Sequence, residues 1–357
     1  MTPTSLSTRD AGWIIFILAL GAGFSVASIY YAQPLLPLMG ANLHLTVEGM
    51  GLVPTLTQAG YALGILFLLP LGDRHDRRRL ILVKSALLAL LLLLCSLTGQ
   101  LSSLLVVSLL IGMAATMAQD IVPAAAVSVA LIGLVMWRVL PRFAVHSTLS
   151  YPQLMASMAH LWQRYPALRR AALAQGALSI AFSAFWSTLA VMLSEHYHMG
   201  SAVAGGFGIA GAAGALAAPL AGGLADKFGA GKVTQMGAAL VTLSFALMFM
   251  LPLLPVHAQL ALIALSAIGF DLGLQSSLVA HQNLVYGLEP QARGRLNALL
   301  FTVVFIGMSL GSVLGSKLYV LAGWNGVVTL AVITGALALA IRLLENARIL
   351  AAERSAS

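Results

Sequence analysis

The chain has 357 residues, of which 60% are hydrophobic and 8% are charged, and its mean hydropathy is +0.94. Soluble domains carry about 25% charged residues, so this composition excludes a soluble fold and predicts a multi-spanning membrane protein. The net charge of +8 does not indicate nucleic-acid binding, because the basic residues stand in short loops between apolar runs and form no continuous face.

Ten apolar runs in the sequence are long enough for a helix to cross the hydrocarbon core, which takes about 20 residues. These runs predict an all-α, multi-pass transmembrane bundle. They begin near Trp13, Met50, Leu80, Ser102, Ala171, Ala202, Val233, Leu260, Leu296 and Trp324.

Glycines gather in several of these runs and predict close contact between helix backbones. They are Gly60 and Gly64 in the second run, the glycines of 205–214 in the run from Ala202, and Gly307, Gly311 and Gly315 in the run from Leu296.

The loops between the runs alternate in charge. Of the 19 Lys and Arg residues, only Lys317 falls on one side of the expected membrane. Because cytoplasmic loops are enriched in Lys and Arg, we expect both termini to be cytoplasmic.

A cluster of charge follows the second run, in LPLGDRHDRRRL at 69–80, and an altered copy returns in GGLADKFGAGK at 222–232. An acid at a helix end can hold a neighbouring helix terminus or an Arg, while basic residues stay at the anionic cytoplasmic face. The alternative is a basic stop after a span, as in any membrane protein. Two copies favour two related halves. The expected loop-motif residues are Gly72, Asp73, Arg74, Arg77, Arg78, Gly222, Asp226, Lys227 and Gly229.

Both copies resemble the loop signature G-x-L-[AG]-D-[RK]-x-G-[RK]-[RK] of the major facilitator superfamily. The second copy is the closer match, whereas the first has Leu69 and Asp76 in place of two glycines. The end of the first run, residues 30–37, also resembles the first helix of bacterial drug-efflux-like facilitators. The resemblance implies a bundle of two pseudo-symmetric halves and transport of a small molecule.

The stretch between the halves is too polar to span. Leu154, Met158 and Leu161 share one face of a helix there, while the opposite face is polar. We expect an amphipathic helix at the membrane surface, and a flexible linker is the alternative. The predicted domains are an N-terminal bundle at 1–140, a cytoplasmic linker at 141–170 and a six-helix C-terminal bundle at 171–357.

The first half is shorter than the second. From Asp226 to Leu344 there are 118 residues, but the corresponding stretch from Asp73 to Leu140 has 67, so about 50 residues are absent. The 39 residues from Ser102 to Leu140 must connect an outside loop to an inside one, and three crossings need about 60 residues. We therefore expect one crossing with a bend near Pro123.

Compared with a twelve-helix facilitator, the fifth helix is the expected loss. The fourth span also has Ser108 where the family pattern R-x-x-x-G carries Arg. In drug antiporters the fifth helix faces the eighth across the interface, so both departures weigh against proton-coupled antiport.

Two acids, Asp120 and Asp271, lie inside span-length apolar runs. A carboxylate there costs about 3 kcal/mol on insertion scales, so it needs a partner, a proton or a water cavity. Asp271, near mid-span, is a candidate for binding substrate or a proton; an interhelical hydrogen bond is the alternative for it. Gln275 and Gln282 lie within about 40° of Asp271 around the helix.

Glutamines in other runs, Gln33, Gln58 and Gln175, are further candidates for a polar cavity, with helix-to-helix hydrogen bonding as the alternative for each. His281 can titrate near neutrality, and a histidine with satisfied hydrogen bonds is the alternative.

Enzyme signatures such as H-E-x-x-H and G-x-S-x-G are absent from the sequence. Gly231-Lys232 resembles the end of a phosphate-binding loop, but Asp226 and Val233 replace the residues such a loop needs. Cys95, the one cysteine, cannot form an intrachain disulfide. We expect no enzyme, no cofactor, no metal and no ATP-driven transport.

The expected function is secondary active efflux of a small molecule by alternating access, in the bacterial inner membrane. A monomer in the lipid bilayer, with a small-molecule substrate, a proton as a candidate further partner and no nucleic-acid partner, fits this hypothesis. The alternative is a membrane protein without transport activity, either a remnant or a ligand-binding or scaffold protein.

Overall fold

The computed structural model of the chain describes residues 32–68, 71, 77–117, 150–200, 202–208, 223, 225 and 227–356, and these residues are helical without strands. The described part confirms the expected all-α membrane bundle. Its α-helices are residues 32–43, α2 (Val47–Leu68), α4 (Arg77–Ser96), α5 (Leu101–Ala114), α7 (Tyr151–Arg164), α8 (Pro166–Tyr197), residues 202–208, α11 (Ala230–Leu247), α12 (Val256–Tyr286) and α13 (Arg293–Ala356). Short 3₁₀ turns follow α5 and α11 and precede α13.

Most of these helices begin a few residues before the apolar runs that predict them. Five helical segments among the described residues are long and apolar enough to span a membrane. The last of them contains both of the final predicted spans, because α13 is broken at Ala322 and Gly323 rather than ended by a loop. Gly323 has φ +60°, a conformation that costs glycine little and other residues more.

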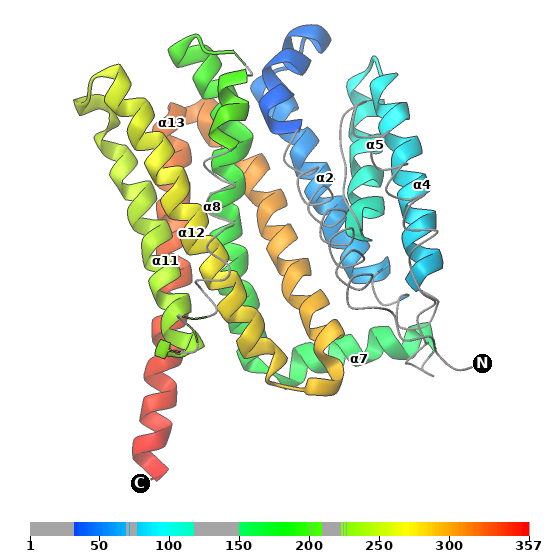
Figure 1. Cartoon of the computed structure of the whole chain (residues 1–357), viewed down its shortest axis with the longest axis vertical. Coiled ribbons are helices and arrows are strands. Elements are labelled where there is room, and N and C mark those ends of the chain that lie inside the picture. The colour runs from blue at the N-terminus through cyan, green and yellow to red at the C-terminus, as the bar shows by residue number, and fades with distance from the viewer. Residues whose placement is uncertain are drawn as a thin grey trace, which may run out of the picture.

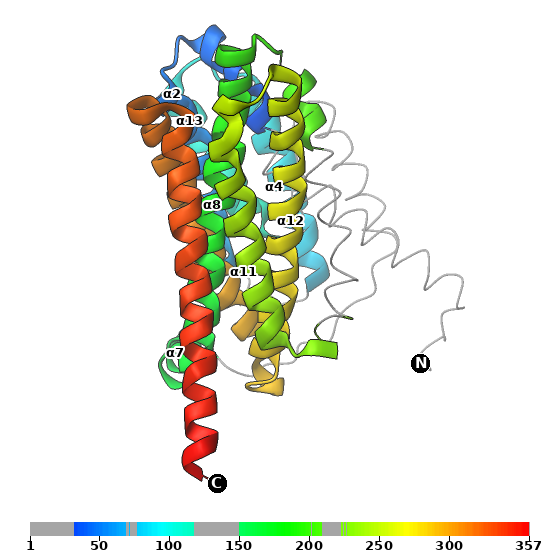
Figure 2. The ribbon, with the colours of Figure 1, turned by 90° about the vertical axis from the view of Figure 1, so that its left-hand side faces the viewer.

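The helices stand side by side in two groups (Figure 1). One group is formed by α2, α4 and α5, and the other by α8, α11, α12 and α13. The groups meet where α2 packs along the first part of α13. Figure 2 shows α11, α12 and the second part of α13 running together, with the end of α13 reaching beyond the bundle.

The close contact between α8 and α13 follows from the glycines of α13. A Cβ at Gly307, Gly311 or Gly315 would overlap the backbone of α8 at Gly176, Ile180 or Ala184. The predicted helix-contact face is therefore confirmed here. In the first group, Gly60 and Gly64 of α2 meet the backbone of α5 in the same way.

The structure describes three of the glycines of 205–214. Gly205, Gly206 and Gly208 are exposed, and no described atom lies within 4 Å of a Cβ built on any of them. Among the described residues these three therefore make no helix contact, because spacing shows only that contact is permitted.

The predicted amphipathic helix is α7, which lies across the lower ends of the other helices in Figure 1. Its buried residues are Leu154, Met158 and Leu161, as the sequence predicts. The Gln153 side chain accepts from the Ser150 N–H at 2.8 Å and caps the start of the helix.

The basic residues gather at the end of the bundle where α7 lies. Arg79, Arg164, Arg295 and Lys232 all stand at helix ends on this side, whereas Lys317 lies one turn before the break of α13 at the opposite end. The charge asymmetry of the sequence is thus an asymmetry between the two ends of the fold.

Candidate functional site

The seam between α2 and α13 joins the two groups through backbone carbonyls. Ser312 Oγ donates to the Gly51 carbonyl at 2.9 Å, and Ser309 Oγ donates to the Thr55 carbonyl at 3.0 Å. Further along, the rings of Tyr61 and Phe305 are 3.9 Å apart between centroids. The seam therefore combines weak hydroxyl bonds with ring contact, and it holds no ion pair among the described residues.

Gln58 is a predicted candidate, and it lies fully buried on α2 against α8. Its Oε1 accepts from Ser183 Oγ at 2.9 Å. Its Nε2 has no acceptor in the described part of the chain. A buried amide that makes half of its bonds is costly to leave unsatisfied, so this group is available to a ligand or a moving helix.

Ser183 belongs to a polar stripe on α8 that spacing alone could have indicated. Gln175, Ser179, Ser183 and Ser187 recur every four residues and are all at most 2% exposed. Ser179 and Ser187 donate to carbonyls of their own helix. Gln175 and Ser183 are the two side chains of this stripe that bind neighbouring helices.

Gln175 joins α8 to α12. Its Nε2 donates to the Leu274 carbonyl at 3.3 Å, so its Oε1 is free to accept from His281 Nδ1 at 2.9 Å. Nδ1 then carries the imidazole proton, and Nε2 of this fully buried ring has no partner among the described residues. The alternative of a satisfied histidine therefore holds for one ring nitrogen only.

Asp271 is the middle residue of the 31-residue helix α12 and is 3% exposed. Its Oδ2 has no hydrogen-bond partner in the described ranges. The alternative, an interhelical hydrogen bond, is thus not made at this oxygen within the described residues. A carboxyl buried at mid-depth in this way needs a proton or a bound cation.

The two glutamines predicted beside Asp271 are half-buried. Gln282 Nε2 donates to Asn297 Oδ1 at 3.1 Å and to Tyr286 Oη at 3.2 Å, near the end of α12. Eleven residues of helix, about 16 Å, separate it from Asp271. Gln282 therefore fits the alternative of helix-to-helix bonding.

Gln33 lies in the helical residues 32–43 and is 2% exposed. No described acceptor binds its Nε2. Gln33, like Gln58 and Asp271, therefore has a buried polar atom that no described residue binds.

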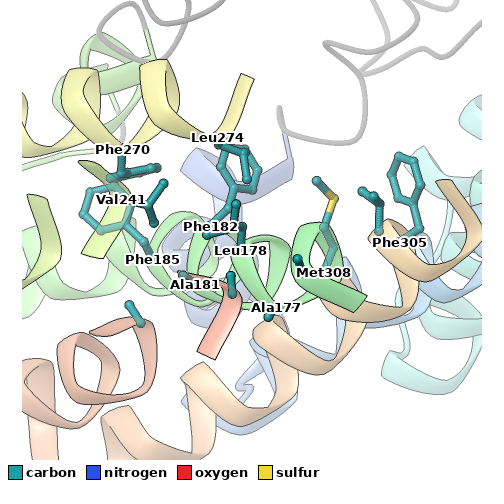
Figure 3. Packing of buried hydrophobic residues seen from close by; sticks show 14 of the residues in the cluster. Ala177, Leu178, Ala181, Phe182, Phe185, Val241, Phe270, Leu274, Phe305 and Met308 are labelled. Carbon is teal, nitrogen blue, oxygen red and sulfur yellow. The ribbon is translucent and has the colours of Figure 1, made fainter. Parts of the chain in front are cut away.

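A group of aromatic side chains fills the second half next to the polar residues, and the sequence did not single it out. The ring of Phe185 on α8 lies 4.8 Å from that of Phe270 on α12, and Figure 3 shows the two converging beside Val241 of α11. Trp186 packs edge-on against Phe185 at 5.2 Å, and its Nε1 has no described partner. These rings pack against one another in the hydrophobic core of the second group.

Lys84 is a residue whose place the sequence did not reveal. It follows the arginines of the basic loop in the sequence, but it lies two turns inside α4 and is 7% exposed. Its Nζ donates to Thr116 Oγ1 at 2.8 Å. No described carboxylate pairs with it.

The structure describes only part of the loop motif. Lys227 is exposed with Nζ 5.3 Å from the centre of the Phe228 ring, and Gly229 precedes α11 with φ +85°. Arg77 and Arg78 belong to the first turn of α4. Outside the described residues lie Gly72, Asp73, Arg74, Gly222, Asp226, Asp120 and Pro123. The His, Cys, Asp and Glu residues of the described ranges form no cluster that fits a metal ion.

Comparison with known proteins decides the family. Residues 18–130 and 172–355 match the Major Facilitator Superfamily. The chain belongs to this superfamily. It is 32% identical to the uncharacterised transporter YgaY of Escherichia coli O157:H7 over 366 positions, which cover 88% of this chain and 91% of YgaY. SCO4007 of Streptomyces coelicolor, described as a probable transporter, is 30% identical and is covered over 83% of its length. The chain is therefore a facilitator-type transporter and not an enzyme.

Solved structures support the same fold. The crystal structure of a point mutant of the nucleoside transporter NupG aligns with a TM-score of 0.66 at 13% identity over 93% of this chain and 98% of that one. A bacterial homologue of the human lysosomal transporter Spinster, inward-facing and unoccupied, gives 0.68 at 14% identity over 95% and 97%.

Proposed function

We propose that this facilitator exports a small molecule from the bacterial cytoplasm by alternating access across the α2–α13 seam. The end that carries α7 and the basic residues then faces the cytoplasm, which places both termini inside. The unit works as a monomer with both helix groups in one chain, and a proton is one candidate for the coupling ion.

The observation that carries this proposal is the set of buried, unpartnered polar atoms at mid-depth. Gln58 lies where the two groups meet, and Asp271 lies at the centre of α12. Transporters of this kind bind substrate near the bilayer midplane at the interface of their halves. The seam itself is made of hydroxyl-to-carbonyl bonds, which exchange more readily than buried ion pairs when the halves rock.

We further propose that the first half lacks the fifth helix. The alignment with YgaY has 366 positions but includes 88% of 357 residues, about 314, so about 52 positions face gaps in this chain. The superfamily match supports placing the gap in the first half, since 18–130 is 113 residues long and 172–355 is 184. The predicted domains at 1–140, 141–170 and 171–357 follow this division.

A shortened first half also favours a second candidate function, a transport-inactive protein that binds a ligand. Everted membrane vesicles distinguish the two. With a proton gradient reported by a pH-sensitive dye, addition of ethidium, tetraphenylphosphonium or nucleosides should collapse part of the gradient in a saturable way. Saturable binding of the same compounds to purified protein, without any flux, would support the second candidate.

The missing helix has its own test, in a Cys95→Ser background. Single cysteines at Ser102 and Arg142 should be labelled from outside and from inside, respectively, if the stretch between them crosses once. Labelling of both from outside requires two crossings and refutes the single-crossing proposal.

A further inference from the structure

A cavity separate from the mid-depth candidates lies at the end of the second helix group where the basic residues gather. It measures about 300 Å³, and four helices contribute to it. Its lining consists of Ala167, Gly231, Gln235, Leu284, Val285, Leu288, Arg342 and Glu345.

Arg342 brings a buried positive charge to this cavity, since it is 5% exposed. Its Nε donates to Thr234 Oγ1 at 2.9 Å, and Nη1 donates to Glu345. Its remaining terminal nitrogen, Nη2, has no acceptor among the described residues. A guanidinium in a partly dry site favours a bidentate anionic ligand.

The charge around the cavity is not balanced. Glu345 is shared, because Arg170 Nη1 also lies 3.5 Å from its Oε1. Two guanidinium groups therefore face one carboxylate. The exposed Lys232, next to the lining residue Gly231, adds positive potential at the rim.

The start of α11 contributes a second feature that favours anions. Gly231 lies in the first turn of this helix, and its N–H has no acceptor within the described part of the chain. First-turn N–H groups and the positive end of the helix dipole both favour a negative group.

We propose that this cavity is a binding site for a phosphate-bearing anion, held by Arg342 and the first turn of α11. Two sources offer that group, an anionic phospholipid headgroup and a soluble phosphate ester. Leu284, Val285 and Leu288 give the cavity an apolar wall that fits a glycerol backbone or the start of an acyl chain. Basic pockets between transmembrane helices at the cytoplasmic interface suit anionic lipids.

The test uses purified full-length protein in nanodiscs and in detergent. Native mass spectrometry counts phosphatidylglycerol and phosphatidylcholine retained by the protein, and a thermal-shift assay with glycerol 3-phosphate tests the soluble source. The natural sequence should retain phosphatidylglycerol ~10-fold better than phosphatidylcholine, the scale of one charge-assisted hydrogen bond. A shift with glycerol 3-phosphate and no lipid preference would assign the site to a soluble ester.

The informative variant is Arg342→Met with Glu345→Leu. It removes the buried pair without changing the net charge, and apolar replacement of such a pair is often neutral for stability. Binding of either probe should be lost. Arg170→Gln keeps the Arg342–Glu345 pair and should weaken binding severalfold. This variant tests the site if the double variant does not fold. Arg293→Gln lowers the charge of the same end by one unit with the cavity intact, and it should bind like the natural sequence.

If binding depended on net charge alone, it would be lost in Arg293→Gln and kept in the double variant. That result would overturn the proposed site. So would the absence of binding of both probes by the natural sequence. These readouts need no transport, so failure of the proposed export function leaves them unaffected.

Discussion

Asp271 has a buried carboxyl oxygen at the centre of α12 that no described group binds. Asp271→Asn keeps the shape of the side chain but removes the acid. We expect ~10-fold slower flux, the scale of one charge-assisted hydrogen bond, or a changed pH dependence of flux, with expression nearly intact. Vesicle flux measured from pH 6 to 8 tests this, with Glu289→Gln at a helix end as the matched control. Flux equal to the natural sequence at every pH would remove Asp271 from the pathway.

The Gln58–Ser183 bond links the two helix groups at mid-depth. Ser183→Ala leaves both polar atoms of the buried Gln58 amide without a partner and should lower stability by about 1–3 kcal/mol. Ser179→Ala is the matched control, because that hydroxyl bonds only to its own helix and should matter little. Thermal melting of the purified variants compares them. Equal melting temperatures would mean that the bond contributes nothing.

The sequence predicted that Asp271, Gln58 and Gln33 are buried, since polar residues inside apolar runs must enter the bundle. It could not predict their partners. Those depend on which helices are neighbours, as the pair Gln175 and His281 shows, since the two residues are 106 positions apart in the sequence. The burial of Lys84 is not evident from the sequence, because a run of arginines precedes it and α4 begins among them at Arg77.

At the scale of the element, Gly311 fixes the approach of α13 to α8. Gly311→Val should force the helices apart and cost about 1–3 kcal/mol, as overpacking of a filled core does. Gly205→Val is the matched control, since open space surrounds that position and little change is expected. The melting temperature and the stability in detergent are measured for both variants and compared with those of the natural sequence. A larger loss from Gly205→Val than from Gly311→Val would contradict the packing described above.

The two glycine patterns also mark the limit of prediction for elements. Both were predicted to form a contact face, yet of these two it is the group at 307–315 that meets another backbone within the described residues. Apolar length predicted where helices lie, and α7 followed from its amphipathic pattern. The fusion of the last two spans into α13 was missed, because a break at one glycine leaves no polar loop in the sequence.

For the whole molecule, the charge asymmetry predicts orientation. Alkaline phosphatase and green fluorescent protein fusions after Trp324 and Ser357 should report a periplasmic and a cytoplasmic site, respectively. Trp324 follows the break of α13 at the end opposite to α7, so the two fusions sample opposite faces. A periplasmic signal at Ser357 would invert the second half and overturn the proposed direction of export.

The attachment of α7 sets how the two helix groups can move. One residue, Tyr165, separates α7 from α8, and Arg169 Nη1 locks that corner by donating to the Trp162 and Gln163 carbonyls. At its other end α7 reaches the first group through Tyr151 Oη, which donates to the Phe67 carbonyl at 3.0 Å. Helix α7 is therefore attached rigidly to the second group, and its start is joined to α2 by one reversible hydrogen bond. Parting of the halves at this end breaks this hydrogen bond, which can form again on return. It must also separate α2 from α13, including the ring contact of Tyr61 with Phe305.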